Sequence, residues 1–153
     1  MSDSVKGMVA GGVATAALSL VMVLIGATGF EPQLELTRLL LATLDAPPSQ
    51  YALGWILHLI VGSVVLGGLF AHIEPRLGAD THTKGGVLYG VLTWLVVMLV
   101  VMPLAGEGPF GFQLSVFAPL VMLGLQLIYG GALGWIYGRL SPTHNPFTKH
   151  HPA

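Results

Sequence analysis

Residues 51–73 have the sequence YALGWILHLIVGSVVLGGLFAHI, a run without lysine, arginine, aspartate or glutamate. At a helical rise of about 1.5 Å per residue this run extends about 34 Å, which is enough to cross the roughly 30 Å hydrocarbon core of a bilayer. The run therefore predicts a membrane-spanning helix, with lipid in place of water around the fold.

Three more apolar runs of similar length occupy residues 7–30, 85–104 and 115–140. Across the 153 residues, 54% are hydrophobic and 8% are charged, which is too little ionic surface for a soluble domain of this size. We therefore predict one transmembrane domain, residues 1–153, with an all-α fold of four transmembrane helices.

Two segments lie outside these runs. Leucines recur at helical spacing over residues 32–45, after Pro32 and before Pro47 and Pro48, which predicts a short amphipathic helix in the membrane interface. Such a helix is either a connector or a lid. The last segment, residues 141–153, is polar and predicts a flexible tail.

The basic residues predict the orientation. Five of the six lysines and arginines fall on one side of the predicted spans: Lys6, Arg76, Lys84, Arg139 and Lys149. The other side carries Arg38 and the acidic residues Glu31, Glu35, Asp45 and Glu107. Because cytoplasmic loops are rich in lysine and arginine, both termini are expected in the cytoplasm.

An internal repeat is visible in the sequence. Residues 6–15 and 84–93 share the pattern K-G-x-V-x-x-G-V-x-T, and LHLIVG at 57–62 matches LQLIYG at 125–130. The repeating unit is thus a two-helix hairpin. We expect two parallel repeats, related by an axis along the membrane normal.

Small residues recur four positions apart in the predicted helices. Such spacing lets helix backbones approach closely in lipid, where no hydrophobic effect drives association. It predicts either tight packing within the bundle or an oligomerisation face. The candidate packing glycines are Gly7, Gly11, Gly86, Gly90, Gly130 and Gly134.

His58 is the candidate site residue, because it lies about two helical turns inside the membrane from Tyr51. Its counterpart in the repeat is Gln126. One interpretation is that the two side chains form an interhelical hydrogen bond. In the other, His58, Gln126 and Glu107 lie along a proton or substrate pathway.

His72 follows His58 by fourteen residues, about 21 Å along a helix. This spacing suits two stacked b-type haems, each needing a second axial ligand from another helix. The matching positions hold Gln126 and Leu140, which are not usual ligands. A haem would therefore need a homodimer, a partner subunit or a methionine, and we expect neither a cofactor nor a metal.

Composition narrows the function classes. The chain has no cysteine, so it has no disulfide and no thiolate site. It has no basic cluster of the kind that binds nucleic acid, and no catalytic motif. We expect a membrane protein that is not an enzyme, either an accessory subunit of a larger membrane complex or a small homo-oligomer. The alternative is a small transporter or proton-conducting protein.

Several motifs resemble a known group of proteins. They are K-G-x-x-A-G-x-x-A-T at 6–15, G-W-x-x-H-x-x-x-G at 54–62, Y-G-x-x-x-W at 89–94, M-P-L-x-G-x-G at 102–108, and Tyr129-Gly130. Together they resemble uncharacterised bacterial membrane proteins of the YagU type. The resemblance implies a bacterial cytoplasmic membrane and no particular activity. That family often has a histidine where this chain has Gln126, which weakens a two-histidine site.

Overall fold

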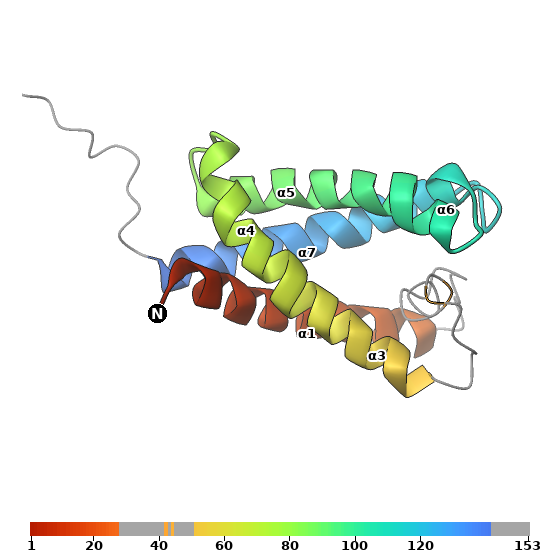
Figure 1. Cartoon of the computed structure of the whole chain (residues 1–153), viewed down its shortest axis with the longest axis horizontal. Coiled ribbons are helices and arrows are strands. Elements are labelled where there is room, and N and C mark those ends of the chain that lie inside the picture. The colour runs from red at the N-terminus through yellow and green to blue at the C-terminus, as the bar shows by residue number, and fades with distance from the viewer. Residues whose placement is uncertain (28–41, 43, 45–50, 142–153) are drawn as a thin grey trace, which may run out of the picture.

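The computed structural model describes residues 1–27, 42, 44 and 51–141, and every regular element in these residues is helical (Figure 1). The predicted interfacial helix, 32–45, and the predicted tail, 141–153, fall almost wholly outside the described residues.

Four spans make up the fold. The first is α1 (Asp3–Ala27), and the second joins α3 (Tyr51–Ile60), the π-helix η2 (Val61–Gly67) and α4 (Gly68–Ile73), followed by the short 3₁₀ turn η3 (Glu74–Arg76). The third joins α5 (His82–Val96), the π-helix η4 (Val97–Val101) and α6 (Met102–Leu104). After the 3₁₀ turn η5 (Pro109–Gly111), the fourth span is α7 (Ala118–Leu140).

Local polar contacts explain where the third and fourth spans begin. The third span was expected to begin at residue 85 but begins at His82, because the Thr81 hydroxyl accepts the Lys84 N–H at 3.2 Å and caps the helix. The fourth was expected from residue 115 but begins at Ala118. Before it, the Phe117 N–H donates to the Ser115 hydroxyl at 3.1 Å in a turn. The length of an apolar run predicts neither the Thr81 cap nor the Ser115 turn.

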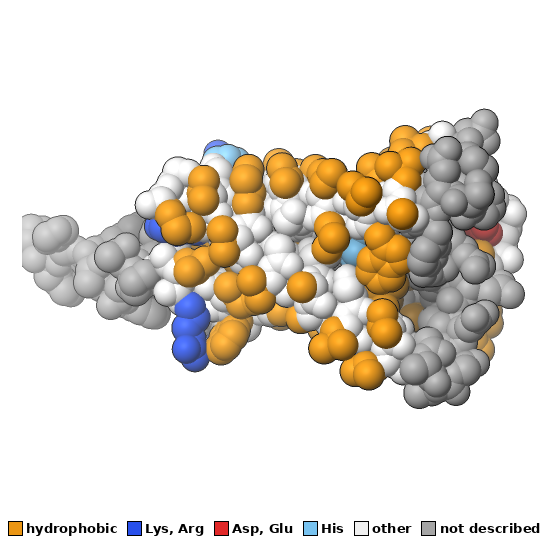
Figure 2. Space-filling model, turned by 90° about the horizontal axis from the view of Figure 1, so that it is seen from below, with side chains coloured by type: hydrophobic (Ala, Val, Ile, Leu, Met, Phe, Trp, Pro, Cys, Tyr) orange, Lys and Arg blue, Asp and Glu red, His pale blue; other side chains and the backbone are white. Residues whose placement is uncertain are grey.

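Four helices in the described part of the chain are long and apolar enough to cross a membrane: Asp3–Ile25, Ala52–Arg76, His82–Leu104 and Ala118–Leu140. Figure 2 shows hydrophobic side chains over the middle of the molecule, with lysine and arginine side chains toward the end that carries the N terminus. This distribution is typical of a protein that is surrounded by lipid.

The four spans form two hairpins. α1 packs against η2 and α4, α5 packs along α7, and α1 also contacts α7. The second and third spans come together near α4 and η3, and Tyr89 of α5 also reaches Leu66 of η2; the two spans diverge toward the other end (Figure 1). The N terminus and the end of α7 lie at the same end of the bundle (Figure 1). The candidate site lies between these diverging spans.

Glycine makes the close helix contacts within both hairpins. A Cβ added to Gly7 would overlap the carbonyl oxygen of Gly67, and one added to Gly86 would overlap that of Gly130. The six glycines expected from sequence all lie at such backbone contacts. The repeat pattern pairs Gly7 with Gly85, but the glycine of α5 that makes the close contact is Gly86. The contacting glycines of the two hairpins are thus shifted by one position relative to the repeat. The repeat relation itself stays a prediction.

Candidate functional site

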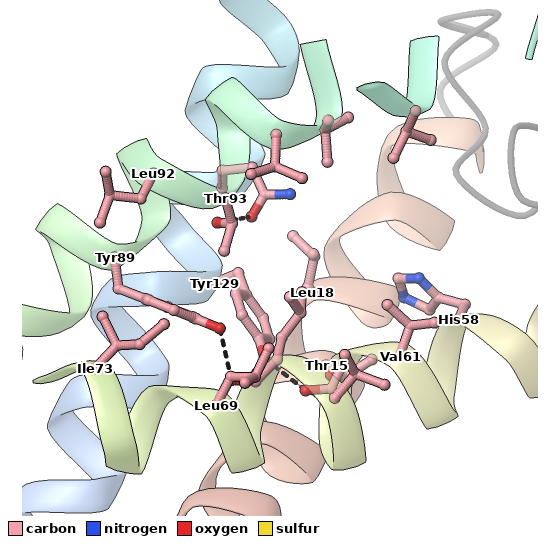
Figure 3. A pocket seen from close by; sticks show the side chains of 17 residues that line it. Thr15, Leu18, His58, Val61, Leu69, Ile73, Tyr89, Leu92, Thr93 and Tyr129 are labelled. Atoms are coloured by element: carbon pink, nitrogen blue, oxygen red, sulfur yellow. Dashed lines mark hydrogen bonds between the residues drawn. The ribbon is translucent and has the colours of Figure 1, made fainter. Parts of the chain in front are cut away.

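A cavity of about 390 Å³ lies between the two hairpins (Figure 3). It is lined by residues of all four spans, most of them apolar. Four of the lining residues, Val65 and Leu69 of the second span and Leu92 and Val96 of the third, are 44–56% exposed. The cavity therefore opens sideways, through the apolar belt. Its polar lining residues are Thr15, His58, Tyr89, Thr93, Gln126 and Tyr129.

Both π-helical segments in the described residues border this cavity. η2 contributes Val61 and Val65 among others, and η4 contributes Val97 and Val101. Pro103 helps to explain η4, because proline has no N–H to donate to the carbonyl four residues earlier. π-Helical turns widen a helix locally and occur frequently at functional sites. Their position on opposite sides of one cavity supports a functional role for it.

Two tyrosines of the second hairpin hold the π-helix of the first. The Tyr129 hydroxyl donates to the Gly62 carbonyl at 2.5 Å, and the Tyr89 hydroxyl donates to the Leu66 carbonyl at 2.9 Å. Both carbonyls belong to η2. Figure 3 shows the two tyrosine side chains extending toward the second span. The hydroxyl protons are thus already used in joining the hairpins.

His58 lines the cavity and is only 7% exposed. Its ring meets the Trp55 ring edge-on, with 5.9 Å between centroids. Its Nε2 atom has no hydrogen-bond partner in the described part of the chain. Buried polar atoms are nearly always hydrogen-bonded, and an ionisable side chain inside a membrane is a functional candidate. His58 is therefore the most unusual group in the cavity.

Gln126 lines the same cavity, but the expected hydrogen bond between Gln126 and His58 is absent. The Gln126 Oε1 atom lies 3.1 Å from the Thr93 hydroxyl, which also lies 3.0 Å from the Gly90 carbonyl. α5 and α7 belong to one hairpin, so the Gln126 Oε1 atom has its hydrogen-bond partner within its own hairpin. The repeat alignment matched the two residues in depth without determining which neighbour each would face.

Two other predicted residues lie away from the cavity. Glu107 is half-buried in the loop between α6 and α7, where its N–H donates to the Met102 carbonyl at 3.0 Å, and it does not line the cavity. His72 is exposed, and its Nε2 atom lies 3.3 Å from the Ser4 hydroxyl. The structure brings His58 and Gln126 to one cavity and leaves Glu107 and His72 outside it.

Several polar residues near the cavity and the adjoining loop were not among the residues predicted for the site. Thr15, Thr93, Tyr89 and Tyr129 line the cavity. Thr15 and Thr93 occupy the same position in the repeat pattern, and this match could have identified them as candidate site residues. A further polar contact, at 2.9 Å between buried Glu74 and His82 Nδ1, links η3 at the end of the second span to the start of α5. The described residues contain no cluster of three or more metal-ligating side chains.

These features define a multi-pass helical membrane protein with a lateral cavity between two hairpins. Residues 1–147 match the model of DUF6789, a family of unknown function, and the chain belongs to this family. The match fits the expected uncharacterised membrane protein, but it is not a match to the YagU type. The search of curated proteins and the search of solved structures found no match.

Proposed function

We propose that this chain is a non-catalytic membrane protein that binds a lipophilic molecule from the bilayer in the cavity between its hairpins. The observation that carries the proposal is the cavity itself, which opens through the apolar belt. Its volume of about 390 Å³ falls within the roughly 300–1,000 Å³ of small-molecule pockets. Such pockets are mainly apolar with a few placed polar groups, as here.

The hairpin arrangement adds support. If the two hairpins are parallel repeats, the cavity lies at the repeat interface, where membrane transporters built from repeats bind their substrates. Release of the bound molecule on the other side of the membrane would make the protein a small transporter. A proton path through His58, Gln126 and Glu107 has less support, because Glu107 does not line the cavity.

We further propose that the protein works in a bacterial cytoplasmic membrane with both termini in the cytoplasm. Lys6, Arg76, Lys84 and Arg139 all belong to the half of the fold that carries the N terminus and the end of α7, which supports this orientation. Apolar outer faces on the helices fit association with lipid, with further copies of the chain, or within a larger membrane complex.

A blocked cavity tests the binding proposal. Val65 lines the cavity and Val64 does not, although both belong to η2 and are 44% and 48% exposed. Val65→Trp is expected to fill the cavity, whereas Val64→Trp places the same indole elsewhere on the helix surface. Native mass spectrometry of the protein in mild detergent should find a bound lipophile in the wild type and in Val64→Trp.

Loss of that bound species in Val65→Trp is the expected result. Equal lipid content in all three proteins would assign the species to the general lipid surface and would contradict the proposal. Size-exclusion profiles and melting temperatures of the two variants provide the control for folding, because both substitutions burden the same π-helix.

A further inference from the structure

The hydrogen bonds around the cavity leave few donors unused. The hydroxyls of Tyr89 and Tyr129 donate to η2 carbonyls, and the Thr15 hydroxyl donates to the Gly11 carbonyl at 2.7 Å. The Thr93 hydroxyl is shared between Gly90 and Gln126. Among the polar groups that line the cavity, His58 Nε2 is the buried atom that has no hydrogen-bond partner within the described residues, and the hydrogen bond of Gln126 uses its Oε1 atom and not its amide nitrogen.

His58 and Gln126 line the cavity from different spans, His58 from the second span and Gln126 from α7. From His58 the lining of the second span continues through Val61, Val65 and Leu69 to Ile73. At the helical rise these residues cover about 22 Å. Figure 3 shows His58 at one end of the lining, with Ile73 and Tyr89 toward the other. The cavity thus has His58, with its unpartnered Nε2 atom, at one end and a long apolar wall along the second span.

We propose that the ligand is an uncharged amphiphile with a carbonyl-bearing head and a long hydrocarbon tail, its head oxygen bound by His58 with Gln126 beside it. A neutral imidazole and a primary amide both offer N–H donors, which match a carbonyl oxygen. The described lining contains no lysine, arginine, aspartate or glutamate to balance a charged head, and an unpaired charge is expensive at this depth. The apolar wall accommodates the tail. This inference rests on the proposed binding function.

Matched probes separate the head from the tail. Dodecylbenzoquinone, dodecylbenzene and dodecylbenzenesulfonate share one tail and differ in a carbonyl, apolar or anionic head. Monododecanoyl glycerol carries an ester carbonyl instead of a quinone carbonyl, and thus tells the two sources of that chemistry apart. Titration of each probe in native mass spectrometry gives its apparent Kd for the wild type, for His58 variants and for Val65→Trp.

At least one carbonyl probe is expected to bind the wild type about five- to tenfold more tightly than dodecylbenzene, the range of one to two hydrogen bonds in a dry site. His58→Phe keeps a ring beside Trp55 but no donor, and should remove that preference without changing the affinity for dodecylbenzene. His58→Gln retains a donor and should restore part of the preference. The comparison of probes in the wild type needs no variant to fold.

Other outcomes contradict specific parts. If dodecylbenzene binds as tightly as the carbonyl probes and Val65→Trp weakens all of them, the cavity binds lipophiles but the proposed head contact is wrong. Tightest binding of the sulfonate would likewise overturn the uncharged head. If no probe distinguishes the wild type from Val65→Trp, the binding function itself is wrong.

Discussion

Replacing certain glycines in this fold should reduce its stability, because a Cβ atom at these positions would overlap backbone atoms of the neighbouring helix. A Cβ on Gly130 would overlap the Gly86 carbonyl and lie 3.0 Å from the Gly90 Cα atom. Backbone atoms in a helix cannot move aside as a flexible side chain does, so α5 and α7 would have to separate. Close packing between backbones is also the main source of association for helices in lipid.

Gly130→Ala should therefore destabilise the protein by about 1–3 kcal/mol, the usual cost of overpacking. Gly124→Ala is the matched control in the same helix, since nothing lies within 4 Å of a Cβ added there. A melting temperature in detergent that falls for Gly130→Ala and holds for Gly124→Ala is the expected result. Equal melting temperatures would mean that α5 and α7 are not packed through Gly130.

Among the elements, the two π-helices are the features that set the cavity apart from an ordinary helix interface. η2 is bonded from across the cavity by Tyr89 and Tyr129, so the second hairpin stabilises the irregular turn of the first. A π-helix is rare and appears mostly as a short bulge inside an α-helix, so hydrogen bonds from another part of the fold help to stabilise it. The tyrosine bonds are that support.

Tyr129→Phe removes the hydroxyl that bonds the Gly62 carbonyl but keeps the ring, and should cost about 1 kcal/mol. Amide hydrogen exchange is expected to accelerate over residues 61–67, because the η2 turns lose their external partner. Tyr137→Phe changes a tyrosine that contacts Phe70 and His82 instead of η2, and should leave exchange at 61–67 unchanged. Unaltered exchange in Tyr129→Phe would show that η2 is stable without it.

The whole molecule is polarised along its long axis. Lysine and arginine side chains gather toward the end that carries the N terminus, and the loop containing Glu107 lies at the other end (Figures 1 and 2). Four crossings bring the start of α1 and the end of α7 to the same end. The positive-inside rule predicts that this end faces the cytoplasm.

Single introduced cysteines test this orientation cleanly, because the chain has no cysteine of its own. In intact cells an impermeant thiol reagent should label Glu107→Cys and should leave Ser2→Cys unlabelled until the membrane is permeabilised. The opposite labelling pattern would invert the topology, and labelling of both positions would contradict four crossings.

The sequence alone predicts the four spans, their packing glycines and the position of His58 inside the membrane. Each depends on a local property: a span on the length and polarity of one run, a glycine contact on spacing along one helix, and the position of His58 on its distance from the end of its run. The first turns of α1 and α5 were not predicted, because they contain polar residues such as Asp3 and His82 and an apolar run does not include such residues.

The cavity depends on how faces of different helices meet. The sequence matched His58 with Gln126, but Gln126 contacts Thr93 because α5 is its neighbour along the whole hairpin. It included Glu107 in the candidate site, yet the loop after α6 keeps Glu107 off the cavity lining. No pattern indicated the π-helices or the tyrosine bonds, because a π turn changes the facing of every later residue and its partners come from the other hairpin. These contacts arise from the packing of one hairpin on the other, and no single span encodes them.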